Sequence, residues 1–175
     1  MGRVVVGVDG SANARRALRW AIDEARQRDA ELHIVHAYRP HHRSSSDRSS
    51  QAAASVGSTR YLDPEADQQR REQDYQSARN ESLGRIDLAL KRVGADVSDL
   101  TVEKHPVVGV HPERALIEVS QGASLLVVGS RGRGGVAGRL MGSVSRACVE
   151  HAGCPVVVIP PEADDQKMSG ETAPA

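Results

Sequence analysis

The glycine-rich segment Gly129–Ser143 holds the residues whose types and spacing best fit a chemical task. Six of the fourteen residues from 129 to 142 are glycine, and they follow the apolar run Leu125–Val128 and precede a helix-like pattern. Glycine lets the backbone approach a ligand closely. A helix start presents free N–H groups and the positive end of the helix dipole, which together bind anions. The segment therefore predicts a phosphate site, and its flanks disfavour the alternative of a flexible connector.

The spacing within this segment narrows the prediction. Two residues separate Gly129 from Gly132, and nine residues separate Gly132 from the pair Gly142-Ser143. This G-x2-G-x9-G-S pattern resembles that of the universal stress protein family, in its ATP-binding type. The family consists of small nucleotide-binding α/β domains, and the resemblance implies that this loop binds the phosphates and ribose of ATP. The residues that it assigns to this part of the site are Gly129, Gly132, Gly142, Ser143, Val144 and Ser145.

The same resemblance assigns residues from other parts of the chain to the base, the ribose and a metal ion. Asp9 matches the acidic residue at the end of the family's first strand, where it contacts the base or ribose or holds Mg²⁺ beside the phosphates. Capping of the following helix together with Ser11 is its alternative role. Adenine is expected near Gly10, Ser11 and Ala37, with Val108 as a neighbour in the loop after the third strand.

Phosphate binding has to work here without a P-loop lysine, because the chain contains no G-x4-G-K-[ST] motif. Arg131 is expected to add positive charge beside the triphosphate, with a solvated loop tip as the alternative. Charged hydrogen bonds contribute on the order of 1.5 to 3 kcal/mol each, and micromolar binding requires about 8 kcal/mol. Backbone donors with Ser143 and Ser145 could supply that. No catalytic triad, metal cluster or carboxylate pair is indicated by spacing, so no catalytic residue is predicted.

Composition excludes several other classes of function. The chain has 175 residues, which suits one domain, and its 23 Lys and Arg balance its 23 Asp and Glu. A neutral chain has no general attraction for nucleic acids or acidic membranes. Aromatic residues make up 2% of the chain and phenylalanine is absent, which disfavours base-stacking platforms. Without a signal peptide or an apolar run of membrane-spanning length, the protein is expected to be cytoplasmic, with no nucleic-acid or membrane partner.

Alternating strand and helix patterns predict an α/β fold. Apolar runs predict strands over 3–8, 32–38, 100–104, 125–128 and 155–160, with 107–110 as a loop. Helical spacing and capping residues predict helices over about 12–29 and 64–93, from Pro112 to Gly122, and from Gly142 to Gly153. Strands and helices in this order make a single doubly wound domain with a five-stranded parallel sheet and helices on both faces. If the polar exits after Val8 and Val128 flank one crevice, the strand order is 3-2-1-4-5, which the resemblance also implies.

One domain is expected over 1–160, with two polar segments. The stretch 40–62 is rich in Ser and predicts a mobile excursion, and 161–175 turns acidic through Asp164 and Asp165 and predicts a disordered tail. In the last helix Val144, Ala147, Cys148 and His151 are expected to face inward. The strand 155–159 lies at a sheet edge in the predicted order, which predicts a homodimer through that strand.

The function predicted from these observations is that of an ATP-binding universal stress protein, a nucleotide-dependent stress regulator or sensor with at most slow ATP hydrolysis. The same fold binding AMP or cyclic AMP is one alternative, because one phosphate could use the same amides. A stress scaffold that binds no nucleotide is another, against which the intact glycine spacing counts. A nicotinamide-dependent oxidoreductase is disfavoured: Gly132–Ala137 satisfies G-x-G-x-x-A, but the helix is expected to begin only at Gly142.

Overall fold

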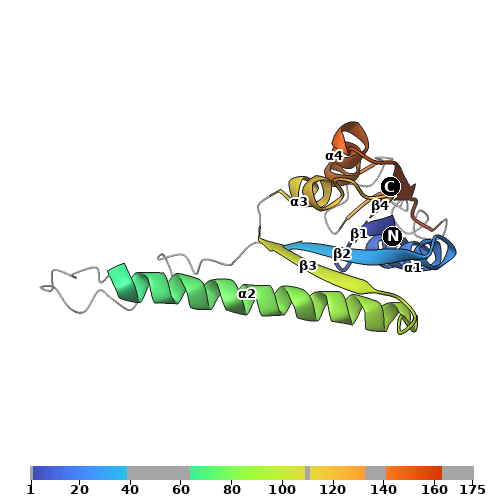
Figure 1. Ribbon diagram of the computed structural model, residues 1–175. Helices are drawn as coiled ribbons and strands as arrows, with labels where there is room; N and C mark the ends of the chain where they lie inside the picture. Colours follow the sequence, from blue (N-terminus) through green and yellow to red (C-terminus); the bar gives the residue numbers. More distant parts are fainter. Residues whose placement is uncertain (1, 39–63, 109–110, 133–140, 163–175) are drawn as a thin grey trace, which may run out of the picture.

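The strands of the described chain form one parallel sheet in the order β3-β2-β1-β4-β5, as predicted (Figure 1). They are β1 (Gly2–Gly7), β2 (Ala30–Tyr38), β3 (Val102–Val108), β4 (Leu125–Gly129) and β5 (Val156–Ile159). β1 pairs with β2 on one side and with β4 on the other. The direction of winding therefore reverses between β1 and β4, and the crevice beyond their carboxyl ends is where such sheets bind ligands.

The computed structural model describes residues 2–38, 64–108, 111–132 and 141–162. The expected excursion over 40–62 lies outside these ranges, and so do residues 163–175 of the expected tail.

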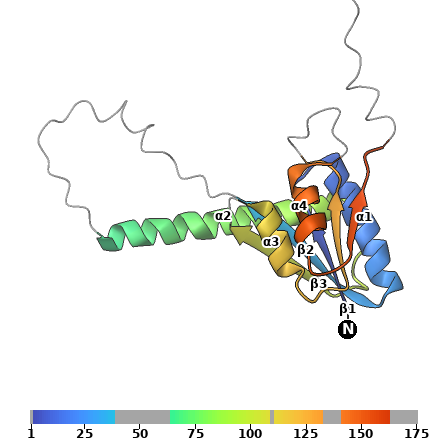
Figure 2. The ribbon, with the colours of Figure 1, turned by 90° about the horizontal axis from the view of Figure 1, so that it is seen from above.

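Two layers of helices cover the two faces of the sheet (Figures 1 and 2). α1 (Ala12–Gln27) and α2 (Pro64–Val93) pack on one face, and α3 (Pro112–Val119) and α4 (Ser143–His151) pack on the other. Strand side chains alternate between these two cores, since successive residues of a strand point to opposite faces. Val4 and Val6 contribute to the α1 and α2 side, whereas Val5 lies between them on the α3 and α4 side, and all three are fully buried.

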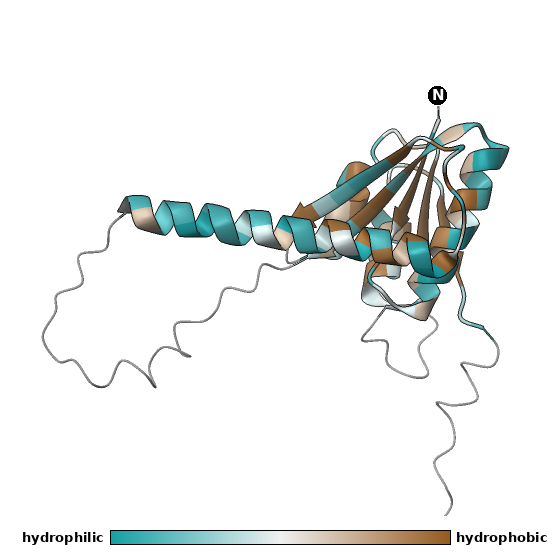
Figure 3. Cartoon of the chain, turned by 90° about the horizontal axis from the view of Figure 1, so that it is seen from below, coloured by the Kyte–Doolittle hydropathy of each residue, from teal (hydrophilic) through white to brown (hydrophobic). Residues whose placement is uncertain are grey.

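α2 is 30 residues long, and only its last turns belong to the core. Its buried positions are Ser82, Ile86, Ala89 and Val93, spaced by three or four residues as one face of a helix requires. The earlier turns are polar and largely exposed, and they extend beyond the sheet (Figure 3). The helix thus changes from polar to apolar along its length. Gly94 ends the helix at φ +66°, a conformation that glycine adopts without strain.

The prediction for the third strand was wrong in its extent. The expected strand 100–104 with a loop over 107–110 is replaced by β3 from Val102 to Val108. Val107 and Val108 pair with Ala37 and Tyr38 of β2, so Val108 is a strand residue. Pro106 is tolerated within β3 because the strand lies at the edge of the sheet, where a missing backbone donor does least harm.

A pair of histidines bridges β2 and β3 on the α3 and α4 side of the sheet. The His33 and His105 rings stack with centroids 4.9 Å apart, and His105 Nε2 lies 2.9 Å from His33 Nδ1. His33 Nε2 lies 3.1 Å from Glu31 Oε2, to which it donates; in a neutral His33 ring, Nδ1 then accepts from His105. Burial, with the neighbouring His33 as a second cause, lowers the pKa of His105.

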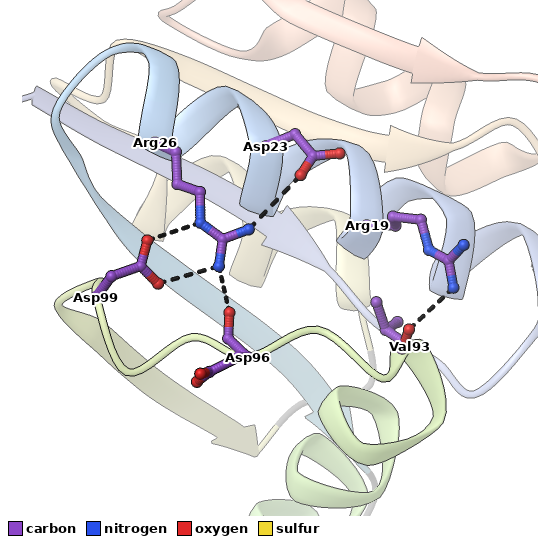
Figure 4. Close-up of polar contacts among 6 residues, drawn as sticks. All are labelled: Arg19, Asp23, Arg26, Val93, Asp96 and Asp99. Atoms are coloured by element: carbon purple, nitrogen blue, oxygen red, sulfur yellow. Dashed lines mark hydrogen bonds and ion pairs between the residues drawn. The ribbon is translucent and has the colours of Figure 1, made fainter.

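Arginines of α1 form hydrogen bonds with the carboxyl end of α2 and with the chain that follows it (Figure 4). Arg26 makes two hydrogen bonds to Asp99, at 2.8 and 3.0 Å, and also donates to the Asp96 carbonyl. The hydrogen bond from Arg26 holds the pKa of Asp99 below its usual value. Arg19 Nη2 donates to the Val93 carbonyl at 2.9 Å, which satisfies one of the acceptors that a helix leaves free at its end.

Candidate functional site

The glycine-rich segment connects the end of β4 with the start of α4, and backbone hydrogen bonds join its two ends. Gly142 N donates to Ser130 O at 2.7 Å, and Ser130 N donates to Ile159 O at 2.7 Å. These bonds hold the two ends of the segment together beside β5. α4 begins at Ser143, next to the predicted start at Gly142, and its N-cap Gly142 has no side chain that could accept a hydrogen bond. Within the described parts of the chain, no side chain accepts from the first N–H groups of α4, so these groups can bind a ligand. Residues 133–140 lie outside the described part of the chain.

A cavity of about 460 Å³ opens between this helix start and the carboxyl ends of β1, β2 and β4. Ligand pockets commonly measure ~300 to 1,000 Å³, so the volume suits a small organic molecule. The residues lining the cavity are Gly7, Val8, Asp9, Ala14, Val35, Ala37, Pro112, Leu116, Val128, Gly129, Arg131, Gly132, Met141, Gly142, Ser143, Val144 and Ser145.

Most of the residues predicted from the sequence lie together around this cavity. Those that line it are Asp9, Ala37, Gly129, Arg131, Gly132, Gly142, Ser143, Val144 and Ser145. Gly10, Ser11 and Val108 do not line it. Gly10 is exposed, with φ +85°, and Val108 ends a strand instead of lying in a loop over the pocket.

The cavity has an apolar part and a polar part. Val35, Leu116 and Val128 are buried side chains from β2, α3 and β4, and Pro112 adds to them from the first turn of α3. The polar part consists of the glycine-rich segment, the start of α4 and the Asp9 side chain. The lining residues that sequence reasoning missed are Gly7, Val8, Ala14, Val35, Pro112, Leu116, Val128 and Met141. Their only signal was a position near a strand's carboxyl end or near the expected loops.

Asp9 has a structural task at the end of β1. Its Oδ1 accepts from Ser11 N at 2.9 Å, and Ser11 Oγ accepts from Ala14 N at 3.1 Å as the N-cap of α1. The capping role expected for Ser11 is thus confirmed. The other oxygen, Oδ2, lies against Gly132, where an added Cβ would be only 2.6 Å away. Asp9 therefore connects the start of α1 with the glycine-rich segment.

Ser145 uses its side chain inside the protein. The hydroxyl donates to Gly129 O at 2.7 Å, and the residue is 3% exposed. Its possible contribution to a ligand is therefore its backbone N–H. The expectation that His151 faces inward was wrong, because His151 is exposed, whereas Ser145 is buried. Gly129 is close to α1, because a Cβ there would lie 3.0 Å from Asn13, so this glycine serves the packing of α1 on β4.

Arg131 brings a buried donor to the cavity. Its Nε is buried and has no hydrogen-bond partner among the described residues. A buried, unpaired donor is destabilising, and an anion in the adjoining cavity could relieve it. The neighbouring Ser130 hydroxyl is also buried without a partner in the described ranges.

No arrangement of protein ligands for a metal ion is apparent in the described parts of the chain. Within them, no group of three or more His, Cys, Asp or Glu side chains could hold a metal. A Mg²⁺ ion at Asp9 would therefore need most of its ligands from water and phosphate, which is how Mg²⁺ commonly binds beside nucleotides. Burial raises the pKa of the Cys148 thiol to about 11, so this core cysteine stays protonated at neutral pH.

A doubly wound α/β domain with a cavity at its switch point is the class that fold and site define. A family model described as the universal stress protein family matches residues 1–160, and the chain belongs to this family. Universal stress protein Rv2005c of Mycobacterium tuberculosis is 35% identical over 157 residues, which cover 89% of this chain and 47% of that protein. Rv2623 of the same organism is 33% identical over 162 residues, covering 89% and 44%. The chain thus spans about half the length of these curated relatives.

Solved structures of the family share the fold. A universal stress protein in complex with cAMP has a TM-score of 0.56 and 28% identity, covering 92% of this chain and 98% of that one. The universal stress protein of Archaeoglobus fulgidus in complex with dAMP has a TM-score of 0.53 and 26% identity, covering 91% and 98%. UspA of Lactobacillus plantarum, at 18% identity and a TM-score of 0.60, supports the fold alone. Among the described helices, none is long and apolar enough to cross a membrane.

Proposed function

We propose that this chain binds ATP in the 460 Å³ cavity and acts as a nucleotide-dependent stress regulator or sensor. The observation that carries the proposal is the uncapped start of α4, which faces an apolar pocket beside the buried Arg131 Nε. Two family members of 26% and 28% identity are named as complexes with dAMP and cAMP, which supports an adenine nucleotide as the ligand.

Each part of the nucleotide has a counterpart in the cavity. The N–H groups at the start of α4 and the Arg131 guanidinium bind the phosphates, since helix starts and arginine both favour anions. Val35, Ala37 and Leu116 form the apolar slot for adenine. Asp9 contacts the ribose or holds a hydrated Mg²⁺ ion. The Ser143 hydroxyl adds a polar group, whereas that of Ser145 is engaged with Gly129.

Binding rather than turnover is the proposed activity, with at most slow hydrolysis of ATP. AMP or cyclic AMP remains the main alternative, and it is favoured by the ligands named for the two solved relatives. The nicotinamide alternative requires a helix that begins within the glycine fingerprint. α4 begins at Ser143, well after Gly132–Ala137, so this alternative has little support.

A homodimer through residues 155–159 is part of the proposal. β5 pairs with β4 and lies at the edge of the sheet, and its valines are half-buried. An edge strand presents unpaired backbone groups on which a second copy can add its own strand.

Calorimetry with ATP, AMP, cyclic AMP and NADH tests the ligand, after mass spectrometry of any nucleotide that co-purifies. Arg131→Gln should weaken ATP binding about tenfold or more, because a hydrogen bond to a charged group contributes roughly 1.5 to 3 kcal/mol. The matched control is Arg146→Gln, which removes an exposed arginine of α4 that does not line the cavity. Equal losses in both variants, or tighter binding of NADH than of the three adenine nucleotides, would contradict the proposal.

A further inference from the structure

A second groove lies on the opposite side of the sheet from α3 and α4. It measures about 500 Å³ and runs between α1, the carboxyl end of α2 and the chain that follows β5. Arginine dominates its polar lining, and the only tryptophan of the chain lies beside these arginines. The residues on which its character depends are Arg15, Arg16, Arg19, Trp20, Arg92 and Glu162.

Three arginines of α1 that line the groove donate to neutral carbonyl oxygens. Arg15 donates to Gly10 O at 3.1 Å, Arg16 to Pro160 O at 2.7 Å, and Arg19 to Val93 O at 2.9 Å, the last drawn in Figure 4. Bonds to carbonyl oxygens orient a guanidinium group and leave its full positive charge. Arg15 and Arg19 therefore remain electrostatically attractive to an anion.

Few negative charges oppose them. Arg92 is exposed and makes no hydrogen bond or ion pair with any described residue. Asp23 lines the groove, but its carboxylate lies 3.7 Å from Arg26. Glu162 lies 3.5 Å from Arg16. The groove thus keeps an excess of positive charge beside an aromatic ring.

The chain that follows β5 brings acidic residues, whose charge is complementary to these arginines, to the groove. Glu162, the last described residue, already lies in the groove, and the sequence continues with Ala163, Asp164 and Asp165. Two extended residues span about 7 Å, whereas the four-residue step from Arg15 to Arg19 along α1 rises about 6 Å. The acidic pair is therefore within reach of Arg15 and Arg19, and Arg92 lines the same groove.

We propose that Asp164 and Asp165 dock in this groove and pair with Arg15, Arg19 and Arg92. The segment is covalently attached at Glu162, so its effective concentration at the groove is about millimolar, which a free anion has to exceed. Docking covers Trp20 and the outer flank of β5 at Ile159, both of which line the groove. The groove is a binding surface for the chain's own acidic segment, separate from the nucleotide cavity.

Trp20 reports directly on the groove, because it is the single tryptophan of the chain. Quenching of its fluorescence by acrylamide, which is neutral, measures its access to solvent. In the full-length protein, Asp164→Asn combined with Asp165→Asn should lower the ratio of docked to undocked segments about three- to tenfold, as expected for two exposed ion pairs. The quenching constant should rise accordingly. About 0.5 M NaCl should raise it in the unchanged protein and have little effect on the double variant.

Matched controls separate docking from a general effect of charge. Glu171→Gln removes an acidic residue farther along the same segment and should leave the quenching constant unchanged. Arg92→Gln should raise it, whereas Lys91→Gln, which changes an exposed neighbour outside the groove, should not. In a double-mutant cycle, Arg92→Gln and Asp165→Asn should be non-additive, as contacting residues are.

Three results would overturn the inference. Equal quenching in the unchanged protein and the Asp164 and Asp165 double variant would mean that the segment does not dock. Protection of Trp20 that rises with protein concentration would assign the groove to the segment of a second copy. Protection by sodium tripolyphosphate that is equally strong in both proteins would assign it to a free anion. Each of these outcomes leaves nucleotide binding in the other cavity untouched.

Discussion

Substitution of Gly132 by alanine tests how the glycine-rich segment and β1 cooperate. A Cβ at position 132 would lie 2.6 Å from Asp9 Oδ2, whereas ordinary contacts begin near 3.4 Å. The carboxylate must therefore retreat by about 0.8 Å, the difference between these two distances. That movement should weaken the 2.9 Å bond from Ser11 N to Asp9 Oδ1. A hydrogen bond to a charged group contributes about 1.5 kcal/mol at the lower end of its range.

The same displacement of the Asp9 carboxylate should weaken ATP binding about tenfold if it costs one such hydrogen bond, because roughly 1.4 kcal/mol of binding free energy corresponds to a factor of ten in affinity. Calorimetry with ATP and chemical unfolding of Gly132→Ala measure the two effects. Gly153→Ala is the control, since its Cβ would meet no other atom within 4 Å and Gly153 does not line the cavity. It adds the same methyl group away from the cavity and should change the affinity little.

A double-mutant cycle decides whether the methyl group acts through Asp9. If it does, Gly132→Ala should have little further effect in an Asp9→Ala background, because the obstructing carboxylate is gone. An equal loss of affinity in both backgrounds would refute this reasoning. The methyl group would then act on the nucleotide itself.

Other regions of the molecule give further predictions. Ser145→Ala removes the bond to Gly129 O and should lower the free energy of unfolding by about 1 to 3 kcal/mol in denaturant titrations. The pKa of His105 is lowered in the folded protein, so the unfolded chain binds this proton first as the pH falls below about 6.5. The free energy of unfolding should therefore decrease as the pH falls through this range, and His105→Gln should make that decrease smaller. An unchanged pH dependence in His105→Gln would contradict the assignment. Val157→Glu should yield a monomer in light scattering while its circular dichroism spectrum stays unchanged. Val149→Glu, at an exposed position of α4, should remain dimeric. A monomer in the protein without substitutions would refute the dimer.

The sheet order and the helix ends were predictable from local chemistry. Ser11 as N-cap and Gly94 as a helix end follow from side-chain capping and from the freedom of glycine at positive φ. The order of the strands followed from asking which strand exits share a crevice. These rules depend on neighbours in sequence or on topology, which a single sequence displays.

The parts that could not be predicted depend on distances between distant residues. Pro106 obscured the extent of β3, because the permissive position of an edge strand is known only once the sheet is assembled. Gly129 lines the cavity, and its additional close approach to Asn13 of α1 could not be read from the sequence. The inward hydrogen bond of Ser145 likewise joins residues sixteen positions apart. The only sequence signal of Met141 as a lining residue was its position in the glycine-rich segment.

The two margins of the sheet are chemically unequal, and this limits how copies of the chain can assemble. β5 presents four apolar residues to an added strand, whereas β3 presents the exposed Glu103 and Lys104 together with Pro106. Charge and proline both discourage strand addition. If two copies join at β5, the enlarged sheet ends in β3 at both extremities. Growth would then be self-terminating, so a closed pair forms in place of a filament.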